Sequence, residues 1–342
     1  MARSIPFLDA DTIRRAVPIG DLLDAVEAAY RDVAAGRDRS PLRSHVALDH
    51  GDLLLMPGVR TGGAGATVKL VTVMPGNASR GLPTVQAVVA WFDADTGTPL
   101  ALLDGGAVTA MRTGAASGVA TRLLARTDAS TLAVLGSGGQ AEWQVRAVVA
   151  SRPITRVLVH ARTAQSRDAF AARMGEALGL DVRAVDSAEE AVSAADVVCA
   201  ATTSTRPVFD AAWIRPGTHV NGIGAYRLDM VELPPELFAR ASLIGVDSRE
   251  AIRAEAGDVM AAVGQGLVTE QQLTEIGSVA RDFAERREPD AITVFKSVGL
   301  AIQDVAAAEL VVARVLGDDR GPTDAPRREH ARDEDSQGRP PH

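Results

Sequence analysis

From Ser130 onward the chain alternates short apolar runs with amphipathic ones. TLAVLG, RVLVHA, DVRAV and DVVCAAT have the length and composition of buried strands, and helical runs such as RDAFAARMGEAL lie between them. HVNGIG and LIGVD are further strand candidates. Strands that alternate with helices in this way predict an α/β fold, a doubly wound parallel sheet with right-handed crossovers.

The first strand of this alternation leads into a glycine loop. VLGSGGQA has the pattern G-x-G-x-x-A at Gly136, Gly138 and Ala141, and it follows a strand and opens a helix. Gly136 permits the tight turn, Gly138 lets the backbone approach a pyrophosphate, and Ala141 lets helix and strand pack closely. The helix N-terminus attracts the phosphates. The motif in this context predicts a Rossmann dinucleotide site.

The end of the second strand bears on the choice of nucleotide. NAD sites usually place an acid there to bind the ribose 2′-hydroxyl. RVLVHA is instead followed by Arg162 and Thr163, and no acid occurs before Asp168. Arg162 is able to accept a 2′-phosphate, so NADP(H) is favoured and NAD(H) stays possible. The alternative is that Arg162 is only a solvated loop residue.

The N-terminal third has a different pattern. DLLDAVEAAYRDVAAG is an amphipathic helix, and SHVALDH, DLLLMPG, ATVKLVTVMPG and TVQAVVAWFDADTGTPLALLDG are β-like runs, the last with a hairpin turn at DADTG. A helical segment rich in small residues follows over 109–124, and the run from about residue 295 predicts another long helix. We therefore expect an N-terminal α+β domain with an antiparallel or mixed sheet beside the Rossmann domain.

Composition excludes several classes of protein. The net charge is −8 and no basic, aromatic-rich block occurs, which argues against nucleic acid as the partner. No apolar run approaches the ~18 residues of a membrane span, and the start lacks the pattern of a signal peptide. The single cysteine, Cys199, fits a reducing cytoplasm and is expected to be an unreactive core thiol. The histidines show no metal-ligand spacing, so no metal is expected.

Lysine usage is unusual. All but two of the 36 basic residues are arginine, and the exceptions are Lys69 and Lys296. Lysine is a compact cation whose pKa shifts on burial, so it can deliver a proton, which arginine does not readily do. Lys69 lies within the apolar strand TVKLVTV, where a charge needs a partner. Chance and ordinary surface charge are the alternative explanation.

Three cations of the N-terminal region are candidates for holding a carboxylate. Arg43 precedes a strand, Lys69 lies within one, and Arg112 lies in the small-residue segment MRTGAASG. Arginine binds a carboxylate bidentately. The alternative is that each cation pairs with an acid of the protein, such as Asp93 or Asp104.

Five motifs occur in a fixed order along the chain: VKLVTVMPGN, RGLPTVQAVVAWFDADTGTPLALLDGGAVTAMRTGAAS, VLGSGGQAEWQ, NGIGAYRLDMVEL and TVFKSVGLAIQD. In sequence and order they resemble the motifs of the ornithine cyclodeaminase/mu-crystallin family. The resemblance covers about residues 5–316. It implies a homodimer that binds NAD(H) or NADP(H). It also implies a substrate-binding and dimerisation domain over 1–120 with 301–316 and a Rossmann domain over 121–300. The tail over 317–342 is polar, rich in Pro and Gly and of mixed charge, so it is expected to be disordered.

The resemblance also implies roles for individual residues. Arg43, Lys69 and Arg112 align with residues that hold the substrate carboxylate, and Lys296 falls near the expected nicotinamide. Residues expected to contact the cofactor are Thr84, Arg112, Gly136, Gly138, Gly139, Gln140, Arg162, Thr163, Thr202 and Ser297.

One turn separates two chemistries within this family. Cyclodeaminases carry G-x-D-x-P-G-K-x-E, in which the aspartate assists proton handling. Here the turn is GAYRLDMVE, so Tyr226 stands where the aspartate would be, and Asp229 is out of register and expected to be structural or capping. The turn of this chain is closer to the form G-S-Y-x-P-D-M-x-E, which resembles the turns of family members that reduce imines. Tyr226 is therefore expected to orient a water or to form a wall of the pocket.

The resulting expectation is an NAD(P)H-dependent reductase that converts an α-imino acid, such as Δ1-pyrroline-2-carboxylate, into an L-amino acid. The carboxylate is clamped by Lys69 and Arg112, and the proton comes from Lys69 or a bound water. The alternatives are an ornithine cyclodeaminase with bound NAD, an alanine dehydrogenase or iminosuccinate reductase, and a mu-crystallin-like ligand-binding protein.

Overall fold

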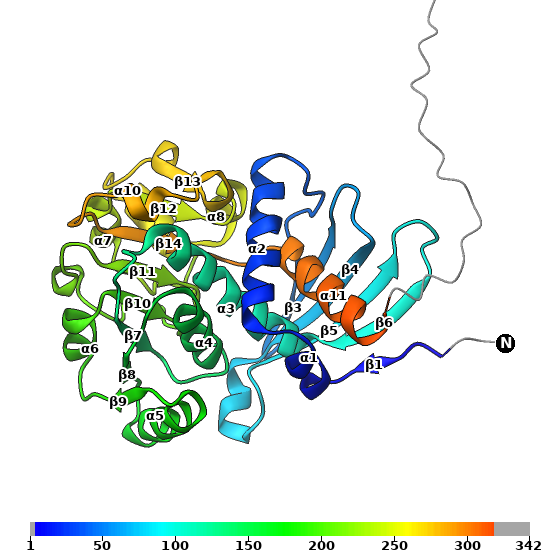
Figure 1. Ribbon diagram of the computed structural model, residues 1–342, viewed down its shortest axis with the longest axis horizontal. Helices are drawn as coiled ribbons and strands as arrows, with labels where there is room; N and C mark the ends of the chain where they lie inside the picture. Colours follow the sequence, from blue (N-terminus) through cyan, green and yellow to red (C-terminus); the bar gives the residue numbers. More distant parts are fainter. Residues whose placement is uncertain (1–3, 318–342) are drawn as a thin grey trace, which may run out of the picture.

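The computed structural model describes residues 4–317. It contains a six-stranded and an eight-stranded sheet, which lie side by side with helices between and around them (Figure 1). The expected α/β class is confirmed. The tail expected to be disordered lies, apart from Gly317, outside the described residues.

The eight-stranded sheet is the Rossmann sheet, and all its strands are parallel. The strand order is β13-β12-β14-β11-β10-β7-β8-β9. The central strands are buried along their whole length, as expected for a parallel sheet covered on both faces. The strands are β7 (Thr131–Leu135), β8 (Arg156–His160), β9 (Asp181–Ala184), β10 (Val197–Ala200), β11 (His219–Gly222), β12 (Leu243–Val246), β13 (Leu273–Glu275) and β14 (Thr293–Lys296).

Helices connect these strands. Their bounds are α4 (Ala141–Ser151), α5 (Ala164–Leu178), α6 (Ala188–Ala194), α7 (Pro235–Arg240), α8 (Arg249–Glu255), α9 (Gly257–Gly264) and α10 (Phe283–Arg286). Thr163 begins α5 by accepting a hydrogen bond from the Ser166 amide, and Ser187 caps α6 in the same way. Short 3₁₀ turns lie at 211–213, 270–272 and 276–278. None of the helices within 4–317 is long and apolar enough to cross a membrane.

The six-stranded sheet is antiparallel except at one edge, where β1 runs parallel to β6. Its order is β1-β6-β5-β4-β3-β2, and its strands are β1 (Phe7–Leu8), β2 (Ser44–Leu48), β3 (Gly51–Val59), β4 (Gly65–Val73), β5 (Val85–Asp93) and β6 (Pro99–Asp104). Burial alternates along β3 and β4, so one face of the sheet is covered by helices. A 3₁₀ turn at Pro75–Arg80 joins β4 to β5, and the hairpin expected at DADTG joins β5 to β6.

Four helices complete this part: α1 (Ala10–Ala16), α2 (Ile19–Ala34), α3 (Gly105–Leu124) and α11 (Ala301–Val315). Helix α11 packs on β3, β4 and β5, whereas α3 contacts strands of both sheets. Asp104 caps α3 by accepting a hydrogen bond from the Ala107 amide. The small residues of α3 permit close packing, since a Cβ at Gly114 would clash with the backbone of Trp143. The domain boundary expected at residue 121 falls inside α3.

One sequence-based expectation is wrong. The run from residue 295 was expected to be helical, but Thr293–Lys296 forms β14, which lies between β11 and β12 in the Rossmann sheet. Ser297 to Leu300 form a loop, and α11 begins only at Ala301. A buried strand of four residues cannot be told from a helix by periodicity alone.

Candidate active site

The glycine loop lies at the carboxyl end of β7, where dinucleotide phosphates bind in Rossmann folds. Gly136 has a φ of 110°, and a Cβ there would lie 2.7 Å from the carbonyl oxygen of Ala201. Gly138 and Gly139 have open space where a Cβ would be, on the side of a groove of about 1210 Å³. The loop therefore fits a pyrophosphate, because the backbone is exposed and α4 presents its N-terminus.

The groove contains most of the residues expected to bind the cofactor. Those that line it are Thr84, Gly136, Gly138, Gly139, Gln140, Arg162, Thr163 and Thr202. Arg162 is exposed at the end of β8, with His160 and Ala161 before it. The groove therefore has the size and the loop geometry for a dinucleotide. Arg162 places a cation where Rossmann proteins usually contact the 2′-group of the ribose.

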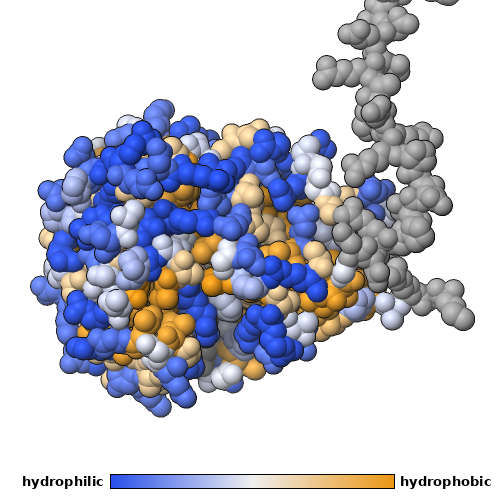
Figure 2. All heavy atoms as spheres, viewed as in Figure 1, coloured by the Kyte–Doolittle hydropathy of each residue, from blue (hydrophilic) through white to orange (hydrophobic). Residues whose placement is uncertain are grey.

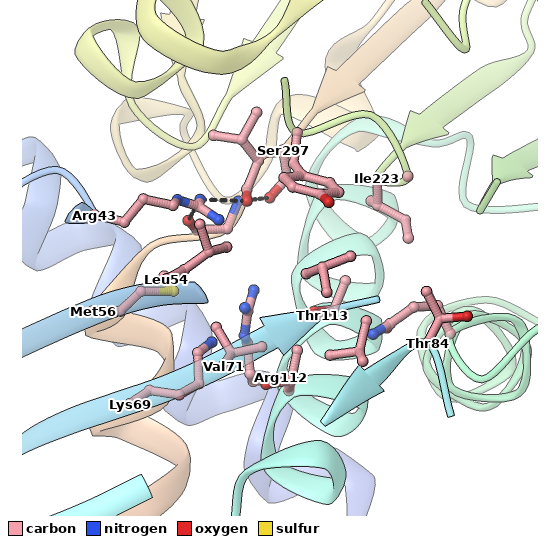
Figure 3. A pocket seen from close by; sticks show the side chains of 18 of the residues that line it. Arg43, Leu54, Met56, Lys69, Val71, Thr84, Arg112, Thr113, Ile223 and Ser297 are labelled. Atoms are coloured by element: carbon pink, nitrogen blue, oxygen red, sulfur yellow. Dashed lines mark hydrogen bonds between the residues drawn. The ribbon is translucent and has the colours of Figure 1, made fainter. Parts of the chain in front are cut away.

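A smaller pocket of about 130 Å³ adjoins the groove. Thr84, Gln140 and Thr203 line both cavities, so a molecule in the pocket is adjacent to one in the groove. The expected residues Arg43, Lys69, Arg112, Tyr226 and Ser297 all line the pocket. Figure 3 shows the nitrogen ends of Lys69 and Arg112 close together, the guanidinium of Arg43 nearer to Ser297, and Thr84 and Thr113 on the other side of the pocket.

Lys69 and Arg112 are held by one carboxylate. The Nζ of Lys69 lies 2.7 Å from Oδ2 of Asp304, and the Nε of Arg112 lies 3.0 Å from Oδ1. All three side chains are buried, with side-chain exposures of 1%, 5% and 0%. Asp304 lies on α11, so β4, α3 and α11 together form the cationic end of the pocket. The expected alternative partners are elsewhere, Asp104 in the cap of α3 and Asp93 in the hairpin turn.

The protonation of this cluster follows from its burial. Burial, followed by the nearby charge of Arg112, lowers the pKa of Lys69 to about 7 against the raising effect of Asp304. Burial opposes ionisation of Asp304, but the charges of Lys69 and Arg112 outweigh it and lower the pKa of that carboxyl. Lys69 is therefore able to gain and lose a proton near neutral pH while Asp304 stays ionised.

Arg112 is oriented by further contacts. Its Nη1 donates a hydrogen bond of 2.7 Å to Oε1 of Gln303, whose amide in turn bonds to the hydroxyl of Tyr30. Gly299 packs against the guanidinium with a φ of 83°, and a Cβ there would lie 2.4 Å from Nη1 of Arg112. The guanidinium is thus fixed on several sides, which pre-organises it for an anion.

Arg43 approaches the pocket from the segment before β2. It pairs with Glu255 at 2.9 Å and donates to the carbonyl oxygens of Val298 and Gly299 at 2.7 Å and 2.6 Å. These carbonyls belong to the loop after β14, which is fixed by the buried carboxylate of Asp247. Arg43 therefore joins the two sheets across the pocket, and its charge is balanced by Glu255.

Tyr226 forms part of the pocket wall, where it packs beside Leu54 and Met56. Burial, followed by the charge of Asp52, raises the pKa of the Tyr226 hydroxyl, which therefore stays protonated. Asp229 does not line the pocket; it pairs with Arg227 at 2.9 Å near the surface. The interpretation of Asp229 as structural agrees with this pairing.

Two other singled-out residues are buried away from the cavities. Lys296 pairs with Asp258 at 3.1 Å and is not among the residues that line the pocket or the groove. The thiol of Cys199 is fully buried in the Rossmann core, and burial raises its pKa to about 12. An unreactive core thiol was expected, and its burial agrees with that.

Several site residues were missed from the sequence. Asp304, Gln303 and Glu255 hold the cations, and Thr109, Thr113, Thr203, Ile223 and Gly224 line the pocket. Thr109 and Thr113 could have been recognised from the sequence, because positions 109 and 113 lie on the same face of a helix as Arg112. Gln303 and Asp304 had another, since they are two polar residues within an otherwise apolar helical run.

The parallel sheet, its glycine loop and the adjoining groove place the protein in the class of Rossmann-type dinucleotide-binding proteins. Within that class the chain belongs to the ornithine cyclodeaminase/mu-crystallin family, whose model matches residues 6–319. The resemblance inferred from the five motifs is thereby confirmed.

Individual relatives are similar over almost their whole length. A Δ1-pyrroline-2-carboxylate reductase of Bacillus cereus is 36% identical over 90% of this chain and 96% of its own. The structure of the Thermococcus litoralis Δ1-pyrroline-2-carboxylate reductase in complex with NADH and L-proline has a TM-score of 0.86 at 35% identity, and covers 91% and 98% of the two chains. An archaeal alanine dehydrogenase dimer with bound NAD has a TM-score of 0.83 at 33% identity, and covers 91% and 96%.

Proposed function

We propose that the protein reduces the C=N bond of a cyclic α-imino carboxylate, with Δ1-pyrroline-2-carboxylate as the leading substrate, to the L-amino acid. The cofactor is a reduced nicotinamide dinucleotide in the groove. The observation that carries the proposal is the shared carboxylate of Asp304. One anion faces two buried cations, Lys69 and Arg112, so the pocket retains one positive charge when Lys69 is protonated.

One uncompensated charge fits a substrate with one carboxylate. The third cation, Arg43, is already balanced by Glu255 at 2.9 Å. A dicarboxylate such as iminosuccinate would bring a second negative charge into a buried site without a free partner, which is costly. The charge balance therefore favours a monocarboxylate over a dicarboxylate.

The rest of the pocket fits an apolar ring. Its lining includes the apolar residues Leu54, Met56, Val71, Val73, Val85, Ile223 and Val298. Within the described residues, no aspartate or glutamate lines this pocket. The side-chain ammonium of ornithine would have no counter-charge there, and Tyr226 occupies the position at which a cyclodeaminase carries its aspartate. Both observations favour the reductase over the cyclodeaminase.

The roles of the protein groups follow from their charges. Arg112, fixed by Asp304 and Gln303, binds the substrate carboxylate. Lys69, with a pKa of about 7, protonates the imine nitrogen, so that the C=N carbon becomes more electrophilic. The cofactor supplies a hydride to that carbon when bound. Tyr226 closes the wall of the pocket and keeps water out.

The groove favours NADPH over NADH in this proposal. Arg162 follows β8 at the position that reads the ribose, and no acid stands beside it in the run His160, Ala161, Arg162, Thr163. A cation accepts a 2′-phosphate, whereas an acid would repel it. Thr163 and Ser166, at the start of α5, add hydroxyl groups and a helix N-terminus at the same place.

The working form is proposed to be a homodimer in the cytoplasm. The outer face of the six-stranded sheet carries exposed Val46, Leu48 and Leu70, and a sheet face of this kind is a suitable surface for a second copy. Figure 2, which views the molecule from the helical side, also shows hydrophobic residues exposed around α11. The buried free thiol of Cys199 fits a reducing compartment.

A screen of nicotinamide oxidation tests the proposal. Purified protein is given NADPH or NADH with cyclic imines, iminosuccinate, or pyruvate plus ammonia. We expect turnover to be fastest with the cyclic monocarboxylate imine and NADPH. Preference for iminosuccinate would contradict the charge argument. Tight NADPH binding without turnover of any compound would instead indicate a ligand-binding protein.

A further inference from the structure

We infer that Lys296 is a positioning residue for the reaction: its buried ammonium holds the carbonyl of Ala225 and thereby fixes where Tyr226 faces the substrate. The inference deepens the proposed function and rests on it. It also explains why a chain that otherwise uses arginine carries a second lysine in its interior.

The contacts of Lys296 are made at the carboxyl end of β14. Its Nζ donates a hydrogen bond of 2.7 Å to the carbonyl oxygen of Ala225 and lies 3.1 Å from Oδ2 of Asp258. Both side chains of the ion pair have an exposure of 0%. A buried charge is tolerated only when it is paired and hydrogen-bonded, and Lys296 has both an ion pair, to Asp258, and a hydrogen bond, to Ala225.

The same turn is held one residue earlier by Glu232. This fully buried carboxylate accepts hydrogen bonds from the amide of Gly224, at 2.8 Å, and from the amide of Thr202. Burial raises the pKa of Glu232, and the charge of Lys296 opposes that effect. Glu232 therefore fixes the amide of Gly224, and Lys296 fixes the carbonyl of the peptide that joins Ala225 to Tyr226.

The turn is held on its other side by the second sheet. Arg227 pairs with Asp52 of β3 at 3.1 Å, and Asp52 also contacts His45 at 2.8 Å. Tyr226 thus lies between Ala225, fixed to the interior of the Rossmann domain, and Arg227, fixed to the substrate sheet. Ala225 is held through its backbone carbonyl and Arg227 through its side chain, and together these contacts limit how far Tyr226 can move.

Lys296 acts through the turn rather than on the substrate, since it lines neither cavity. Loss of its ammonium frees the Ala225 carbonyl and lets the Tyr226 wall move. A displacement of about 1 Å in a substrate-positioning group can cost on the order of 100-fold in rate. The amide of Thr202, which lines the groove, keeps its hydrogen bond to Glu232, so dinucleotide binding is expected to be preserved.

The test is a double-variant comparison of Lys296→Met and Tyr226→Ala in the full-length protein, with Asp258→Asn as a milder variant. We expect Lys296→Met to lower kcat/KM for the imine about 10-fold to 100-fold, with the KM for NADPH within about twofold of wild type. In the double variant the imine kcat/KM is expected to be no lower than in Tyr226→Ala alone, because residues that act as a unit are not additive. Asp258→Asn keeps the shape of the pair, and we expect a smaller loss of the same kind.

A matched control is Glu27→Gln. Glu27 is a buried carboxylate with a side-chain exposure of 8%, and it pairs with Arg31, Arg122 and Arg281 away from both cavities. Its loss is therefore expected to lower the melting temperature without changing the imine kinetics. Fully additive effects of Lys296→Met and Tyr226→Ala would overturn the inference. So would a parallel rise in the KM for NADPH, or wild-type imine kinetics in both Lys296→Met and Asp258→Asn.

A binding measurement separates this inference from the proposed function. The probe is pyrrole-2-carboxylate, a planar five-membered ring with one carboxylate, titrated into the protein saturated with NADPH. We expect its Kd to rise about tenfold in Lys296→Met and to stay unchanged in Glu27→Gln. If wild type turns over no imine but this difference persists, the proposed function fails and the positioning role stands. If wild type reduces the imine but the Kd does not change, the positioning role fails alone.

Discussion

The ammonium of Lys69 lies 2.7 Å from the carboxylate of Asp304, and both side chains are buried although β4 and α11 lie near opposite ends of the chain. The same carboxylate binds Arg112 at 3.0 Å. This pairing gives the pocket its one unbalanced positive charge, and the chemistry proposed for the protein depends on it.

Removal of the Lys69 ammonium is expected to abolish imine reduction. In Lys69→Ala the imine loses its proton donor and part of its carboxylate clamp, so we expect kcat/KM to fall by about 10²-fold to 10⁴-fold. The KM for NADPH is expected to change little. Arg37→Ala, which breaks an ion pair with Asp32 outside both cavities, serves as the control. Near-wild-type activity in Lys69→Ala would exclude it as proton donor.

The rate is expected to depend on pH through Lys69. Burial lowers its pKa to about 7, so the ammonium predominates below that pH and is lost above it. We expect kcat/KM for the imine to fall as pH rises through about 7. In Asp304→Asn the anion that raises this pKa is gone, so the fall in kcat/KM is expected to occur at lower pH. If kcat/KM in this variant instead fell at higher pH than in the wild type, the assignment of Lys69 as the titrating group would be contradicted.

Gly299 is expected to be required for the position of Arg112. It has a φ of 83°, and a Cβ there would lie 2.4 Å from Nη1 of Arg112. Gly299→Ala is therefore expected to displace the guanidinium and raise the KM for the imine about tenfold or more. Gly266→Ala is a matched control, since its φ is 72° and nothing lies within 4 Å of an added Cβ. Equal kinetic effects of the two substitutions would show that backbone strain alone is responsible.

Arg162 is expected to determine cofactor preference. Arg162→Ala removes the cation that we propose binds a 2′-phosphate but leaves the rest of the groove intact. We expect the KM for NADPH to rise about tenfold, which corresponds to one charge-assisted hydrogen bond at an exposed position. The KM for NADH is expected to stay within about twofold. An equal change for both cofactors would mean that Arg162 is only a solvated loop residue.

Most of the fold could be predicted from periodicity. The alternation after Ser130 predicts the Rossmann strands from β7 to β12, and the alternating runs before residue 105 predict the second sheet. The strand Thr293–Lys296 could not be recognised, because four buried residues next to an apolar helix carry no distinct period. The order of strands across each sheet likewise depends on long-range packing that no local pattern contains.

The site could be predicted only in part. Lys69 was recognisable because a charge within an apolar strand needs a partner, but the partner itself was not, since Asp304 lies in another element far along the chain. The sequence offers Asp93 and Asp104 as candidate partners, but Asp93 accepts hydrogen bonds within a turn and Asp104 caps α3. Proximity in sequence is a poor guide to ion pairs that join separate elements.

Reduction of a cyclic imino acid with NADPH is tested most directly by measuring, in one reaction, the NADPH oxidised and the L-proline formed from Δ1-pyrroline-2-carboxylate. A parallel reaction contains ornithine and no added nicotinamide. We expect one L-proline for each NADPH oxidised, and neither ammonia nor proline from ornithine. Formation of ammonia and proline from ornithine without added nicotinamide would contradict the reductase and indicate a cyclodeaminase.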